Sequence, residues 1–148
     1  IGLGFNYRLN EIQSVLGIIQ LSKLSHWIKK RQKIFTKYSE ELKNLPIILP
    51  RKFKKLVSSN HLYVIQTQER SGKERNKLYN FLIKNKVEPN VHYIPIHTHP
   101  FYKKLGFKYS NFPNANLYYK RCLSIPLYAG LKDNDQDKII HLIKKYFK

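Results

Sequence analysis

Three histidines and a tyrosine gather in one short stretch of the chain, a density that could support chemistry. The stretch reads Asn90-Val91-His92-Tyr93-Ile94-Pro95-Ile96-His97, and His99 follows two residues later. Imidazole and phenol groups hydrogen-bond sugar hydroxyls and phosphates while presenting an apolar face. They also ligate metals, but His-x4-His-x-His is not a recognised zinc spacing, and a metal site needs three or four ligands in fixed geometry. We therefore expect a binding or structural role here and no metal site.

Two further polar groups stand at places where a chain often binds anions or begins a strand. Asn6-Tyr7-Arg8 directly precedes a helical pattern, and helix N-termini attract anions. From spacing alone, a turn with a solvated Arg8 is the simpler interpretation. Ser58-Ser59-Asn60-His61 precedes the apolar run Leu62-Tyr63-Val64-Ile65, where a structural histidine and a ligand histidine are equally plausible. Nothing matches a Gly-x-Ser-x-Gly nucleophile or a phosphate-binding glycine loop.

The charge is strongly basic, with 28 Lys and Arg against 9 Asp and Glu and a net charge of +19. Such a charge is typical of proteins that bind nucleic acid or acidic surfaces. Here the basic residues are scattered in pairs, and Lys, Asn, Ile and Tyr are all frequent, as in proteins from AT-rich genomes. We favour this compositional origin and regard nucleic acid as an improbable partner.

Cysteine content and hydropathy indicate a cytoplasmic protein. The single cysteine, Cys122, excludes an internal disulfide and stands in an apolar run, which predicts a core residue rather than a nucleophile. No segment reaches the roughly 20 apolar residues needed to span a bilayer, and no signal peptide is visible. The sequence does not begin with methionine, so we expect part of a longer protein.

Hydrophobic periodicity predicts an α+β fold preceded by a helical arm. Asn10 and Gln13 form a capping-box pattern before an apolar stripe of Leu9, Ile12, Leu16, Ile19 and Leu24. Ser25 is a plausible cap for a second helix. The expected elements are helices over 10–24, 26–44, 73–85, 114–121 and 133–146, strands over 62–65, 87–91 and 123–125, and an ordered aromatic loop over 92–112. We divide the chain into an arm, 1–44, and a small α/β domain, 45–148.

Four motifs, in this order, resemble the DegT/DnrJ/StrS sugar aminotransferases over essentially the whole chain. They are Asn-Tyr-Arg-Leu-x-Glu-Ile-Gln (6–13), His-Leu-Tyr (61–63), His-Tyr-x-Pro-x-His (92–97) and Leu-Ser-Ile-Pro-Leu-Tyr-x-Gly-Leu (123–131). The resemblance implies the C-terminal small domain of a fold-type I aminotransferase that uses pyridoxal 5′-phosphate, with the N-terminal cofactor domain absent. The Schiff-base lysine of the family belongs to that domain, so we expect this chain alone to be inactive.

The resemblance also implies roles for individual residues. Asn6 would reach the cofactor phosphate or the substrate in a partner subunit, with Arg8 as a weaker candidate, and the helix after them would form a homodimer interface. Asn90, Val91, His92 and Tyr93 would face the substrate. His97 and Tyr102 are less certain candidates for the same role.

The stretch HTHPFYKKLGFKYSNFPNA (97–115) is most similar to the branch of the family that acts in pseudaminic acid biosynthesis. That branch implies glutamate as the amino donor and a UDP-linked 4-keto-6-deoxy sugar as the acceptor. The alternative is a stand-alone basic module that binds nucleic acid or an acidic partner. Its binding would weaken steeply with salt.

Overall fold

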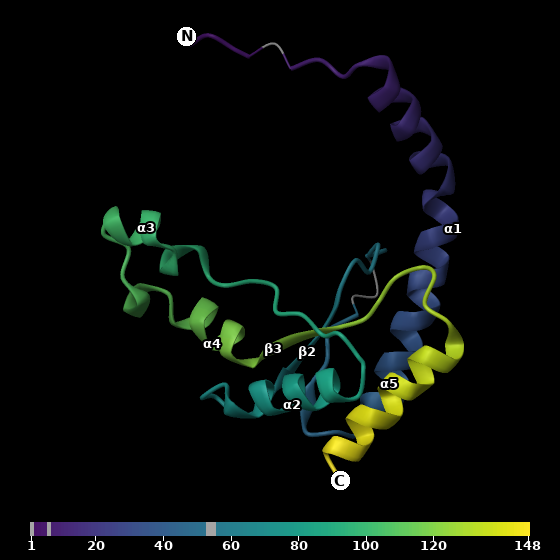
Figure 1. Ribbon diagram of the computed structural model, residues 1–148, viewed down its shortest axis with the longest axis vertical. Helices are drawn as coiled ribbons and strands as arrows, with labels where there is room; N and C mark the ends of the chain where they lie inside the picture. Colours follow the sequence, from purple (N-terminus) through teal and green to yellow (C-terminus); the bar gives the residue numbers. More distant parts are fainter. Residues whose placement is uncertain (1, 6, 53–55) are drawn as a thin grey trace.

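A computed structural model describes residues 2–5, 7–52 and 56–148 (Figure 1). One long helix, α1 (Glu11–Leu42), leads into a three-stranded antiparallel sheet of order β1-β2-β3. The strands are β1 (Ile47–Ile48), β2 (Tyr63–Thr67) and β3 (Cys122–Ile125), and the longer helices that follow α1 are α2 (Lys73–Lys84), α4 (Pro113–Arg121) and α5 (Asp133–Tyr146). Three short helical segments complete the fold: η1 (Ile96–Thr98), α3 (Pro100–Lys104) and η2 (Tyr109–Asn111). The predicted α+β class is confirmed.

Helix α1 is continuous, so the prediction of two helices with a new cap at Ser25 is wrong. The capping box at its start is confirmed: the Asn10 side chain accepts from the backbone N–H of Gln13 at 2.9 Å, and the Gln13 side chain accepts from that of Asn10 at 3.1 Å. The second half of α1 packs against the rest of the chain. Such packing stabilises the helix enough for it to continue past Ser25, where the local sequence favours a boundary.

The core forms where the second half of α1 meets the sheet, α2 and α5. Tyr38 and Leu42 of α1 and Tyr63 of β2 are fully buried. The Tyr38 hydroxyl donates to the Pro126 carbonyl at 2.9 Å, so its polar end is also satisfied. Cys122 is buried as predicted, and burial raises the pKa of its thiol. The cysteine is therefore a small core residue.

Helices α1 and α5 also face each other through three ion pairs. Their N–O distances are 3.6 Å for Lys33–Asp133, 2.6 Å for Lys37–Asp137 and 2.5 Å for Lys144–Glu41. Exposed pairs of this kind contribute about 1 kcal/mol or less each. They fix the register of the two helices more than they stabilise the fold.

Strand predictions were partly right. Strands β2 and β3 lie where expected and pair from Tyr63 opposite Ile125 to Gln66 opposite Cys122. The strand expected over 87–91 is wrong in extent, because only an isolated bridge joins Asn90 to Ser124. The two-residue strand β1 was not predicted, since two apolar residues carry no periodicity. No helix in the described part of the chain is both long and apolar enough to cross a membrane.

Replacing Leu78 by alanine tests the core. This α2 side chain is fully buried in the cluster that α1, the sheet and α5 share. Loss of its methyl groups leaves a cavity, so we expect the free energy of unfolding to fall by about 2–5 kcal/mol. Urea unfolding followed by circular dichroism measures the change. Lys77→Ala, on the exposed side of the same helix, should stay within about 0.5 kcal/mol of the wild type, and an equal loss in both variants would contradict the assigned core.

Glu69 caps the start of α2 and makes stability depend on pH. Hydrogen bonds from Ser71, first from its side chain and then from its backbone, lower the pKa of the Glu69 carboxyl to about 2. Because the pKa of Glu69 is lower in the folded chain than in the unfolded chain, the ionised carboxylate stabilises the fold. This stabilisation is complete at pH values above the ordinary pKa of glutamate and is lost as the pH falls toward 2. Glu69→Gln should therefore melt below the wild type at pH 7, and the difference should shrink between pH 5 and 2. A difference that is unchanged over this range, or equally large for Glu88→Gln, would contradict the assignment.

Candidate functional site

The segment that carries the histidine cluster is attached to β3 at one residue, Ser124. The backbone N–H of Asn90 donates to the Ser124 carbonyl at 2.9 Å, and the N–H of Ser124 donates to the Asn90 carbonyl at 2.8 Å. The Ser124 hydroxyl also hydrogen-bonds Nδ1 of His92 at 2.8 Å. Ser124 is itself buried in a strand of four buried residues. The start of the segment is therefore fixed to the most rigid part of the fold.

Tyr93 projects from this attachment into solvent. Its side chain is 72% exposed, and its ring meets the His92 ring edge to face at 4.6 Å. The peptide bond between the two residues is cis. His92 is half-buried and has its Nδ1 occupied by Ser124, which leaves Nε2 for another partner. The structure thus brings Asn90, Val91, His92 and Tyr93 together, with one imidazole nitrogen and one phenol available to a ligand.

His97, the fifth residue that the sequence assigned to this side of the site, is placed differently. Its side chain is only 5% exposed, and its Nε2 hydrogen-bonds Oδ1 of Asn116 at 2.8 Å. Its ring stacks on Phe112 with 4.5 Å between centroids. Its imidazole therefore lies inside the fold formed by residues 96–121, which projects from the sheet in Figure 1. A direct contact between His97 and substrate stays a prediction.

A hollow of about 440 Å³ adjoins the start of the segment. It is lined by Asn90, Val91 and Ile94 from the segment and by Arg75, Asn76, Tyr79, Asn80 and Tyr119 from α2 and α4. The Arg75 guanidinium lies 5.3 Å from the Tyr119 ring centroid, and its Nε donates to the Lys120 carbonyl at 3.4 Å. Local sequence patterns do not single out Arg75 among 28 basic residues, because only folding brings α2 next to Asn90.

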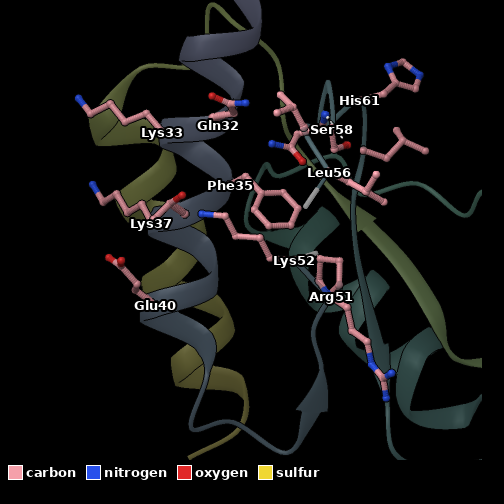
Figure 2. A pocket seen from close by; sticks show the side chains of 15 residues that line it. Gln32, Lys33, Phe35, Lys37, Glu40, Arg51, Lys52, Leu56, Ser58 and His61 are labelled. Atoms are coloured by element: carbon pink, nitrogen blue, oxygen red, sulfur yellow. Dashed lines mark hydrogen bonds between the residues drawn. The ribbon is translucent and has the colours of Figure 1, made fainter. Parts of the chain in front are cut away.

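A larger hollow of about 1400 Å³ lies between α1 and residues 50–52 and 56–62 (Figure 2). In Figure 2, Phe35 points toward the segment that carries Leu56 and Ser58, whereas Lys33 and Glu40 point away from it. His61 is exposed at the rim and lies just before β2. This hollow gathers the third group of sequence candidates, Ser58 to His61, apart from the histidine segment.

Of the N-terminal candidates, Arg8 lines neither hollow. Asn6 lies outside the described residues, so its predicted contact with the cofactor stays a prediction. Arg8 is exposed, and the chain around it extends away from the sheet with the first turns of α1 (Figure 1). Along those turns Leu9, Ile12 and Leu16 are 75%, 82% and 56% exposed. This is an apolar face without a partner among the described residues.

Two lysines at the larger hollow, Lys33 and Lys37, are paired with carboxylates of α5. Pyridoxal phosphate needs a lysine with a lowered pKa at its carbonyl carbon. The larger hollow includes Lys37, but the Asp137 carboxylate raises the pKa of Lys37 through a hydrogen bond. Lys33 is likewise paired, with Asp133. Within the described ranges, no cluster of three or more His, Cys, Asp or Glu side chains is placed to hold a metal ion.

Comparisons with known proteins identify the family of the chain. A model of the DegT/DnrJ/EryC1/StrS aminotransferase family matches residues 1–144. The chain is 35% identical to the spore coat polysaccharide biosynthesis protein SpsC of Bacillus subtilis, over 98% of this chain and 38% of that protein. It is 34% identical to the UDP-4-amino-4,6-dideoxy-N-acetyl-beta-L-altrosamine transaminase of Campylobacter jejuni, over 97% of this chain and 39% of that protein.

Solved structures show the same likeness. The sugar aminotransferase Spr1654 of Streptococcus pneumoniae in its PMP form superposes with a TM-score of 0.88 at 30% identity. The match covers 94% of this chain and 35% of that one, and the chain spans about 38% of the length of its curated relatives. Spr1654 has also been solved in its PLP form, at a TM-score of 0.86 and 29% identity. The chain belongs to the DegT/DnrJ/EryC1/StrS aminotransferase family.

Proposed function

We propose that this chain is the substrate-side part of an aminotransferase that moves an amino group from glutamate to a nucleotide-linked 4-keto-6-deoxy sugar. The observation that carries the proposal is the His92–Tyr93 pair, presented to solvent from a backbone that Ser124 fixes to β3. Preorganised polar and aromatic groups of this kind bind sugars without losing much conformational entropy. The aminotransferase family of the chain and its likeness to the Campylobacter jejuni transaminase support an amino sugar as the product.

The residues of the chain divide the work of binding. His92 would use Nε2 and Tyr93 its hydroxyl for sugar or phosphate oxygens. Arg75, oriented by Tyr119 and the Lys120 carbonyl, adds a positive charge beside Asn90. The likeness to the Campylobacter jejuni transaminase supports UDP as the nucleotide. Pyridoxal phosphate, when bound, supplies the electron sink for amino transfer, and its lysine would come from a further domain of the complete protein.

The exposed face of α1 supports a homodimer. Leu9, Ile12, Leu16 and Ile19 recur at helical spacing and are all exposed. Burying such a stripe against a second copy removes apolar surface from water at about 25 cal/mol per Å². The same packing would bring the residues before α1, Asn6 and Arg8 among them, toward the partner subunit. The buried free thiol of Cys122 supports a location in the reducing cytoplasm.

Amino transfer by the complete protein, expressed with its cofactor domain, tests the function. We expect glutamate-dependent amination of a UDP-linked 4-keto-6-deoxy sugar, followed by mass spectrometry. Tyr93→Ala should lower kcat/KM about tenfold, the loss expected for one hydrogen bond of about 1.4 kcal/mol. Tyr118→Ala, at another exposed tyrosine of the same domain, should leave it unchanged.

Two results would contradict this function. One is the absence of any glutamate-dependent amination by the cofactor-loaded wild type. The other is binding of generic double-stranded DNA by the chain at physiological salt, with log affinity falling steeply against log salt. The second result would favour the basic binding module.

The dimer is tested by placing charge on the stripe. Ile12→Asp combined with Leu16→Asp should convert a dimer into monomer in sedimentation velocity, because two carboxylates would have to be buried at the interface. Ser14→Asp lies on the opposite side of the same helix and should leave the dimer intact. A monomeric wild type, or equal dissociation of both variants, would contradict the proposed interface.

A further inference from the structure

Two polar side chains, His97 and Asn116, are buried together in the part of the fold that follows the candidate site. Each is 5% exposed, and they are joined by the 2.8 Å hydrogen bond between Nε2 and Oδ1. Burying a polar side chain is unfavourable unless its hydrogen bonds are made. Neither residue reaches the hollow beside Asn90. A role for this pair must therefore come from what it holds together.

The orientation of the Asn116 amide fixes the protonation of His97. The Asn116 Nδ2 group donates to the Tyr109 carbonyl at 2.6 Å, and a carbonyl can only accept. The opposite atom, Oδ1, is therefore the acceptor toward His97. His97 must carry its proton on Nε2 to donate to it. Asn116 thus selects one tautomer of the imidazole and fixes the plane of its ring.

This pair joins three separate pieces of the chain. His97 comes from η1, the carbonyl of Tyr109 from η2, and Asn116 from α4. The residue after His97 closes a turn onto Pro95: the backbone N–H and the hydroxyl of Thr98 donate to the Pro95 carbonyl at 2.9 and 2.7 Å. Hydrogen bonds therefore hold the chain at a second point, His97, four residues after Tyr93.

Tyr93 lies between two attachments of this kind. Ser124 holds the chain at Asn90 and His92, and Asn116 holds it at His97. Between these two attachments lie residues 93–96, of which Pro95 is held, within the described part of the chain, only by the local turn with Thr98. If either attachment is lost, residues 93–96 become more mobile. A more mobile Tyr93 loses more conformational entropy when it binds a ligand.

We propose that Asn116 is a positioning residue that, through the tautomer and ring plane of His97, holds Tyr93 and Ile94 in their binding arrangement. That the ligand of Tyr93 and Ile94 is a nucleotide sugar rests on the proposed function. The positioning itself does not.

Hydrogen exchange of the complete protein without ligand, read by mass spectrometry over the peptides of this chain, tests the positioning. Asn116→Leu removes the acceptor and the donor at nearly the same volume. We expect exchange over residues 93–99 to accelerate at least tenfold, while β2 stays as protected as in the wild type. Asn114→Leu, at an exposed asparagine of the same helix, is the matched control and should change neither region.

Conservative replacement of His97 separates positioning from simple packing. His97→Gln retains a side-chain N–H for Asn116 and should keep exchange over 93–99 within threefold of the wild type, whereas His97→Leu should accelerate it as Asn116→Leu does. Unchanged exchange in Asn116→Leu would overturn the proposal. So would equal acceleration in His97→Gln and His97→Leu, or a loss of β2 protection in both Asn116→Leu and His97→Gln.

Binding of UDP-N-acetylglucosamine to the complete protein, measured by calorimetry, separates this inference from the proposed function. We expect Asn116→Leu to weaken binding about tenfold and Asn114→Leu to retain it. Wild-type protein that does not bind the probe would count against the proposed function, and the exchange result would still decide the positioning. Tenfold faster exchange with unchanged binding would overturn the link from Asn116 to the ligand.

Discussion

The second half of α1 carries an apolar face that the remaining chain must cover, and this requirement organises the fold. Tyr38 and Leu42 lie on that face, and Tyr63 lies on the central strand, β2. All three side chains are fully buried. The aromatic rings of Phe35 and Tyr38 lie 4.8 and 5.0 Å from that of Tyr63. Because β2 is held in this way, β3 can pair along it, and every residue of β3 is buried. The rigidity of the candidate site begins with this contact.

Hydrogen bonds of polar side chains connect β3 to the candidate site. Ser124 holds Asn90 and His92, while His97 and Asn116 join the pieces that follow. The result is a short exposed span, 93–96, supported by buried hydrogen bonds on both sides. Loops that bind ligands commonly have this design, in which a rigid scaffold presents a few residues. Asp133 and Asp137 of α5 are meanwhile paired with Lys33 and Lys37 of α1.

Much of the fold could be predicted because local signals and burial agreed. The Asn10–Gln13 capping box, helices α2, α4 and α5, and strands β2 and β3 each have a clear periodic or capping pattern. Two predictions failed where tertiary contacts overrode local signals, and one strand was missed. Packing carried α1 through Ser25, the strand over 87–91 shrank to one bridge at Asn90, and β1 was too short to recognise.

The sequence by itself determined the family, because four motifs in the correct order identify it, and it determined which segment carries the candidate site. Only the tertiary structure decided what each side chain in that segment does. His92 and His97 look alike in the sequence, yet one keeps a free nitrogen beside exposed Tyr93 and the other is buried against Asn116. Arg75 joins Asn90 only after folding. The reason is that hydrogen-bond partners 19 to 32 residues apart are set by packing, which leaves no mark in local spacing.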